Sequence, residues 1–140
     1  MPISRKAASL HSVHGWVRDR LPAADYGAIK LDEPLSELGT IGYQTTEEVQ
    51  LKRYLCHVVG YPADKAQTMW GHASKLQAVG SRTITYNTDT YGGNSGGPVL
   101  IFENGGVTGV GIHNYGDLRG NSATRITEEV FENIERWASI

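Results

Sequence analysis

The hydrophobic pattern of the chain predicts short β-strands almost throughout. Seven runs are rich in β-branched and aromatic residues and are separated by clusters of Gly, Pro, Asn and Asp. They cover residues 9–17, 26–31, 53–61, 68–76, 81–88, 97–102 and 106–112. Many short strands with turn signals between them are typical of a sandwich or a barrel. The pattern therefore indicates an all-β fold.

The end of the chain has a different period. Ile126, Val130, Ile134 and Trp137 recur at helical spacing. Thr127 stands where an N-cap belongs, and two glutamates follow it in the first turn. We therefore expect a C-terminal α-helix.

Composition narrows the possible functions. The chain has 140 residues, 39% hydrophobic and 20% charged, enough for one globular domain or two very small ones. Residues 32–42 carry turn residues without a clear period, which suggests a boundary near residue 40. A formal net charge of −2 and the lack of a long Lys/Arg block argue against a nucleic-acid partner. No apolar run is long enough for a membrane span or a signal peptide. The single cysteine, Cys56, lies in an apolar run, where we expect a small buried residue.

The most informative stretch is DTYGGNSGGPV, residues 89–99, in which Ser95 stands between two pairs of glycines. A phosphate-binding P-loop needs a lysine and a hydroxyl after its last glycine, but Pro98 follows here. The nucleophile elbow of an α/β-hydrolase opens into a helix, whereas an apolar strand follows here. Glycines also let backbone N–H groups converge beside a serine hydroxyl, as an oxyanion site requires. A plain hairpin turn of small residues is the alternative.

Together with GVGIHNYG at residues 109–116, this stretch resembles the C-terminal half of chymotrypsin-like serine endopeptidases. The resemblance is strongest to the glutamyl endopeptidase (V8-like) branch. It extends to residues 16–31, 58–62 and 121–126, and so covers most of the chain. It implies a chymotrypsin-like Greek-key β-barrel with a C-terminal helix. Residues 41–140 would form a complete second barrel, and residues 1–40 only part of the first.

The resemblance also implies an activity, the hydrolysis of peptide bonds through an acyl-enzyme. Ser95 matches the nucleophile, and the N–H groups of Gly93 and Ser95 match the oxyanion hole. Asp25 matches the acid that orients the catalytic histidine; taken alone, it would be an ordinary turn residue. Asn94 replaces the aspartate that pairs with a newly cut N-terminus in trypsin-like enzymes, so maturation would not use that ion pair. A peptide or protein substrate, secretion and no metal or organic cofactor are further implications.

The specificity pocket has two interpretations. His113 matches the pocket histidine of acid-specific members, and Thr90 matches the hydroxyl residue beside it; both can donate to a substrate carboxylate. Asp89 lies where trypsin-like enzymes hold the acid that selects Lys or Arg. An acid also occurs there in acid-specific relatives, so we expect cleavage after acidic residues.

The catalytic histidine of the family has no match in this chain. It would lie well upstream of Asp25, and His11 and His14 are too close to it in sequence. The chain therefore resembles the C-terminal portion of a protease and is expected to be inactive or very weak alone. We expect it to self-associate or to be complemented by a segment that carries the histidine. A non-catalytic module that binds extended peptides is the alternative function.

Overall fold

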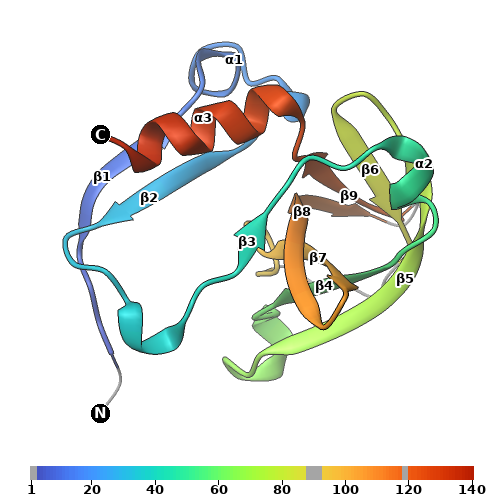
Figure 1. Cartoon of the computed structure of the whole chain (residues 1–140), viewed down its shortest axis with the longest axis horizontal. Helices are drawn as coiled ribbons and strands as arrows, with labels where there is room; N and C mark the ends of the chain where they lie inside the picture. Colours follow the sequence, from blue (N-terminus) through green and yellow to red (C-terminus); the bar gives the residue numbers. More distant parts are fainter. Residues whose placement is uncertain (1–2, 88–92, 118–119) are drawn as a thin grey trace.

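The computed structural model describes residues 3–87, 93–117 and 120–140, and its strands form two sheets (Figure 1). The strands are β1 (Ala7–Ser12), β2 (Gly27–Leu31), β3 (Gly42–Tyr43), β4 (Leu55–Gly60), β5 (Trp70–Val79), β6 (Thr83–Tyr86), β7 (Pro98–Glu103), β8 (Gly106–Asp117) and β9 (Gly120–Arg125). The helices are α1 (His14–Val17), α2 (Glu48–Leu51) and α3 (Glu128–Ala138), with 3₁₀ turns η1 (Pro22–Ala24), η2 (Ser36–Leu38) and η3 (Ala63–Lys65).

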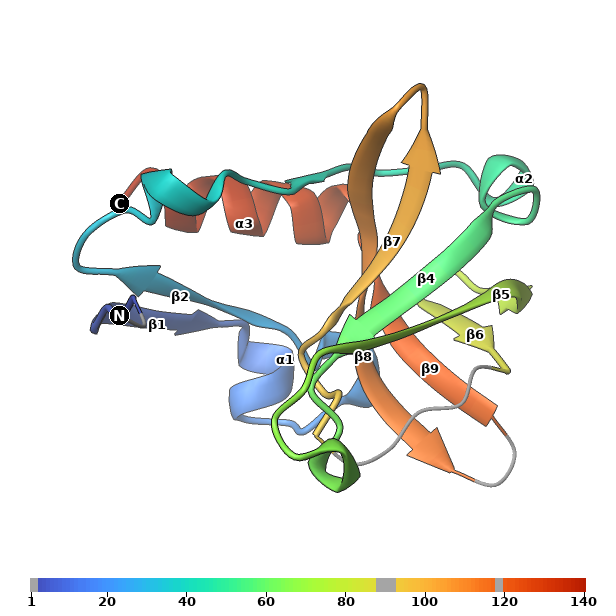
Figure 2. The ribbon, with the colours of Figure 1, turned by 90° about the horizontal axis from the view of Figure 1, so that it is seen from below.

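Six strands close into a barrel in the order β8-β7-β4-β5-β6-β9, because β9 pairs again with β8. All six neighbouring pairs are antiparallel, and β3 adds to the side of β8 as a short parallel strand. Figure 2 shows this barrel beside the β1–β2 pair. Closure leaves the six strands without an open edge. The predictions of an all-β barrel and of a C-terminal helix are confirmed.

Alternate residues of the barrel strands point inward and form its core. Leu51 of helix α2 joins this core, and its buried strand residues are Cys56, Val58, Val79, Ile84, Tyr86, Val99, Ile101, Val110 and Ala123. Cys56 is 1% exposed, as expected, and burial raises the pKa of its thiol to about 11. The thiol is therefore protonated at neutral pH and behaves as an apolar core group.

Strands β1 and β2 form a separate two-stranded sheet that helix α3 covers on one face (Figures 1 and 2). Trp137 of α3 stacks on His11 of β1, at 5.9 Å between ring centroids, and packs against Tyr26. Leu10 and Ile29 are paired in register on the other face. They are 72% and 65% exposed, so this face of the sheet is apolar and open.

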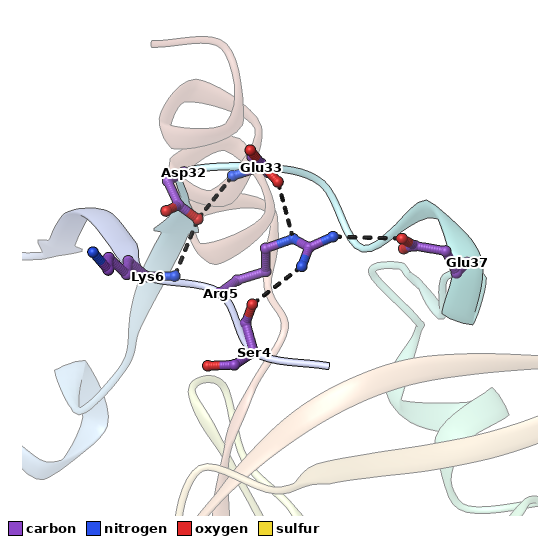
Figure 3. Close-up of polar contacts among 6 residues, drawn as sticks. All are labelled: Ser4, Arg5, Lys6, Asp32, Glu33 and Glu37. Carbon is purple, nitrogen blue, oxygen red and sulfur yellow. Dashed lines mark hydrogen bonds and ion pairs between the residues drawn. The ribbon is translucent and has the colours of Figure 1, made fainter. Parts of the chain in front are cut away.

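Charged contacts hold the start of β1 near the loop that follows β2 (Figure 3). The Arg5 guanidinium lies 3.6 Å from a carboxylate oxygen of Glu33 and 3.4 Å from one of Glu37. Asp32 Oδ1 accepts hydrogen bonds from the backbone N–H groups of Lys6 and Glu33, each at 3.0 Å. Exposed ion pairs contribute little to the free energy of unfolding. The main effect of these contacts is therefore to fix the position at which β1 begins.

The sequence predictions fail at short elements. Residues 14–17 were predicted as strand but form helix α1, with the Trp16 and Val17 N–H groups both donating to the carbonyl of Val13. Helix α2 and strand β9 were not predicted. Helix α3 is confirmed, and the hydroxyl of its N-cap, Thr127, accepts from the N–H of Val130. No helix in the described ranges is long and apolar enough to cross a membrane.

Candidate active site

Ser95 lies exposed on a tight loop that leads into β7. Gly93 and Gly96 have φ angles of 107° and 84°, which favour glycine. At Gly97, a Cβ atom would come within 2.4 Å of the carbonyl oxygen of Val59, so only glycine fits against the end of β4. These glycines therefore set the backbone path of residues 93–97.

The loop is also bonded to β8. The Gly96 N–H donates to the carbonyl of His113 at 2.7 Å, and the His113 N–H donates to the carbonyl of Gly97 at 2.9 Å. The Ser95 hydroxyl donates to the carbonyl of Asn114 at 3.2 Å. In this chain the hydroxyl is thus paired with a main-chain oxygen, which cannot take its proton. The Gly93 and Ser95 N–H groups lie on this loop, and their oxyanion role stays a prediction.

Asp25 follows the turn η1 and is bonded to β8 and β9. Its backbone carbonyl accepts from the Asn114 side-chain amide and, at 3.2 Å, from the Thr124 hydroxyl. Its carboxylate oxygen Oδ2 accepts from the Tyr115 hydroxyl at 2.9 Å. An aspartate from the first 31 residues is therefore held on the barrel next to the serine loop.

Asp25 and Ser95 line the same cavity, which has a volume of about 700 Å³. The lining residues are Ser12, Trp16, Asp25, Tyr26, Gly27, Ile29, Ser95, Gly96, Ile112, His113 and Asn114. The two residues that the family resemblance assigned as acid and nucleophile, 70 positions apart in the chain, thus line one cavity. The cavity is large enough for a side chain the size of an imidazole.

His113 is 3% exposed, and its ring Nδ1 lies 2.6 Å from the hydroxyl of the fully buried Tyr86. Burial lowers the pKa of the His113 imidazole and raises the pKa of the Tyr86 phenol, so both groups are neutral at pH 7. A phenol that keeps its proton can donate it to Nδ1, which leaves the proton of the ring on Nε2. Asp89 and Thr90, the other two predicted pocket residues, lie outside the described residues.

Two other histidines, His11 and His57, make contacts away from Ser95. His11 Nε2 bonds the Ser9 hydroxyl at 2.8 Å, and its ring stacks on helix α3. His57 packs edge-on against Phe102 of β7. Among the described residues that line the cavity, His113 is the only histidine. None of these side chains is placed as a base for Ser95.

Sequence reasoning missed three residues of the site. Asn114, Tyr115 and Thr124 all bond Asp25, but they look like ordinary strand residues in the sequence. The only available signal was that two of them directly follow His113 in a polar interruption of an apolar strand. A second cavity, of about 370 Å³, is also lined by Ser95 and otherwise mostly by apolar residues, among them Ile41 and Met69.

The closed barrel and the glycine-flanked serine before β7 define the class of chymotrypsin-like serine peptidase folds. Comparison with known families agrees. The family model described as "Trypsin-like peptidase domain" matches residues 5–110, which is more than half of the chain and includes both Asp25 and Ser95. The chain belongs to the trypsin-like peptidase family.

Its relatives include glutamyl endopeptidases. The chain is 38% identical over 123 residues to the glutamyl endopeptidase of Bacillus licheniformis, covering 81% of this chain and 39% of that protein. It is 39% identical over 132 residues to a Bacillus subtilis protein named "Extracellular metalloprotease", covering 92% and 42%. The chain therefore spans less than half the length of these relatives. A solved Glu endopeptidase has the same fold, with a TM-score of 0.86 at 22% identity, over 97% of this chain and 65% of that one.

The name of the Bacillus subtilis relative raises the question of a metal. No group of three or more His, Cys, Asp or Glu side chains that could hold a metal ion occurs within residues 3–87, 93–117 and 120–140. The donor set that a metalloprotease needs is thus not found in the described part of the chain.

Proposed function

We propose that the chain is the serine-bearing part of an extracellular endopeptidase that cleaves peptide bonds after acidic residues. The observation that carries the proposal is the cavity shared by Asp25 and Ser95. A nucleophile and an acid facing one space leave room between them for a base. Membership of the trypsin-like peptidase family and the similarity to glutamyl endopeptidases support the same conclusion.

The reaction would proceed in two acyl-transfer steps. The Ser95 Oγ attacks the carbonyl carbon of the substrate while an imidazole in the cavity takes its proton. The N–H groups of Gly93 and Ser95 stabilise the negative oxygen of the tetrahedral intermediate. The imidazolium then protonates the leaving amine, which leaves the acyl group on Ser95. In the second step the imidazole takes a proton from water, the water attacks the acyl group, and the proton returns to Ser95 Oγ as the acid product leaves. The Asp25 carboxylate orients the imidazole and stabilises its charged form. This chemistry requires no cofactor.

Specificity for acidic residues rests on His113. Its neutral ring, bonded at Nδ1 by Tyr86, would donate from Nε2–H to a substrate carboxylate. Thr90 would add a second donor. In an active form, His113→Ala should lose far more activity on Glu and Asp substrates than on apolar ones. A peptide-library digest read by mass spectrometry tests this, and cleavage after Lys or Arg would instead assign the pocket to Asp89.

The base would come from a segment outside this chain, since none of the described cavity residues fits that role. The open face with Leu10 and Ile29 beside the cavity would receive such a segment or, without it, a second copy of the chain. The chain alone should then react poorly with a fluorophosphonate, a reagent that labels activated serines.

Added imidazole provides the decisive test. The cavity has room for it, so millimolar imidazole should accelerate fluorophosphonate labelling of the 140-residue chain, while N-methylated pyrrole of similar size should not. Ser95→Ala should abolish labelling, and Asp25→Asn should reduce the imidazole-dependent rate. If imidazole has no effect, the shared cavity is not a catalytic site and the peptide-binding alternative gains support. Rapid labelling without imidazole would show that the chain holds its own base.

A further inference from the structure

Tyr115 reaches Asp25 because strand β8 is irregular next to His113. The register between β8 and β9 shifts between His113 and Tyr115, so that Tyr115 is opposite Ser122 while His113 is opposite Ala123. In a regular strand, residues two apart point to the same face. Here His113 is 3% exposed and Tyr115 is 41% exposed. The bulge re-aims Tyr115 away from the barrel core, which is a common use of bulges beside functional sites.

The re-aimed side chain meets the carboxylate of Asp25. The Tyr115 hydroxyl donates to Oδ2 at 2.9 Å, while the backbone of Asp25 is held separately by Asn114 and Thr124. The backbone contacts fix the position of the residue, and the Tyr115 contact fixes the rotation of its carboxylate. Only one carboxylate oxygen is used by Tyr115, and a carboxylate has a second acceptor oxygen. The phenol of Tyr115 can orient the Asp25 carboxylate because it donates a hydrogen bond, which an apolar side chain cannot do.

We propose that Tyr115 is a positioning residue for the Asp25 carboxylate. It holds Oδ2 so that Oδ1 is presented to the base that occupies the cavity. The proposal rests on the proposed function, because it assigns Tyr115 a role in setting the acid of that site. The acceptor of the Tyr115 hydroxyl is negatively charged, and hydrogen bonds to charged groups are stronger than hydrogen bonds between neutral groups.

The contact can be tested without any activity. Proximity of the Asp25 carboxylate contributes to the raised pKa of the Tyr115 phenol, whose first cause is burial. With ¹³Cζ-labelled tyrosine, the NMR signal that disappears in Tyr115→Phe should titrate at lower pH in Asp25→Asn, because the neutral amide no longer opposes the phenolate. Tyr54 donates to Glu103 in the same manner but far from the site, and its titration should not change. An unchanged Tyr115 titration in Asp25→Asn would overturn the proposal.

The positioning role is tested by the imidazole-dependent labelling of Ser95. Tyr115→Phe should slow it about 10-fold, the loss that one hydrogen bond to a charged acceptor causes. The pH midpoint of the imidazole-dependent rate should rise, since an Asp25 carboxylate without its donor favours imidazolium more strongly. Tyr54→Phe is the matched control and should retain the rate and the midpoint.

The outcomes separate the two proposals. A Tyr115→Phe rate and midpoint equal to those of the unsubstituted chain would overturn the positioning role even if the NMR titration shows the contact. Imidazole could fail to accelerate the labelling of Ser95 even in the unsubstituted chain, while Asp25→Asn still shifts the Tyr115 titration. In that case the proposed function fails, and Tyr115 is only a structural partner of Asp25. Slower labelling with a raised midpoint, seen in Tyr115→Phe but not in Tyr54→Phe, would support the proposal.

Discussion

The stability of the fold should depend on pH through His113. The imidazole is 3% exposed, and burial lowers its pKa below the ordinary value of about 6.5. Between the two pKa values, the unfolded chain binds a proton at this residue and the folded chain does not. Lowering the pH in that range therefore favours the unfolded chain. The contribution of neutral His113 to the free energy of unfolding is fully present above about pH 6.5, and it is lost as the pH falls from there toward the lowered pKa of the folded chain.

One proton of difference corresponds to a slope of at most about 1.4 kcal/mol per pH unit in the free energy of unfolding. The slope should appear in urea unfolding curves, recorded by tryptophan fluorescence at intervals from pH 7.5 to 5.5. This range lies above the ordinary pKa values of carboxylates, whose titration would otherwise dominate. Protonation of His113 also interferes with its bond to the Tyr86 hydroxyl, because Nδ1 then carries a proton itself.

Two variants test whether His113, and not another residue, causes the pH dependence of the free energy of unfolding. His113→Gln should flatten the dependence on pH, although it should lower stability at pH 7.5 by about 1–3 kcal/mol because a buried partner of Tyr86 is changed. His14→Gln replaces an exposed histidine of α1 and should keep the slope of the unsubstituted chain. Direct NMR titration of the His113 ring in the folded chain completes the test. A midpoint at or above 6.5 would refute the reasoning.

Three further predictions concern packing. Trp137→Ala should cost about 3–5 kcal/mol in urea unfolding, since it empties the contact between α3 and the β1–β2 sheet, and a change below 1 kcal/mol would contradict this packing. Gly97→Ala should destabilise the chain by at least 2 kcal/mol and disorder the serine loop, whereas Gly42→Ala, with open space around it, should change stability little; thermal unfolding compares them. The unsubstituted chain should self-associate in size-exclusion chromatography with light scattering, and Leu10→Lys should reduce this by placing a charge on the face shared with Ile29; a monomeric unsubstituted chain would count against an open interface.

Sequence reasoning succeeded where local patterns decide the structure. The period of α3 is local, and the predicted helix is confirmed. The glycine pattern at Ser95 is also local, and Gly93 and Gly96 have the positive φ angles that favour glycine. It failed where tertiary contacts decide. Trp16 and Val17 have strand propensity, yet a single helical turn forms because the chain must reverse before Asp25.

Other features of the site depend on contacts that no local pattern records. Strand β9 has the sequence GNSATR, with few strand-forming residues, and exists because β6 and β8 both pair with it. The bond between Tyr115 and Asp25 joins residues 90 positions apart and requires a bulge in β8. The roles of Asp25, Ser95 and His113 were assigned through the family resemblance, and Asp25 taken alone would have been an ordinary turn residue.

The packing of α3 on the β1–β2 sheet has a consequence for biosynthesis. Helix α3, which covers the first two strands, begins almost 100 residues after β2 ends at Leu31, so it has not yet been synthesised when those strands emerge from the ribosome. During translation both faces of β1 and β2 are exposed, and Asp25 cannot yet bond Tyr115 or Thr124. The β1–β2 sheet therefore stays uncovered on that face until α3 has been made and has left the ribosome. Nascent chains ending before residue 128 should leave it accessible to proteases, and chains that include α3 should protect it.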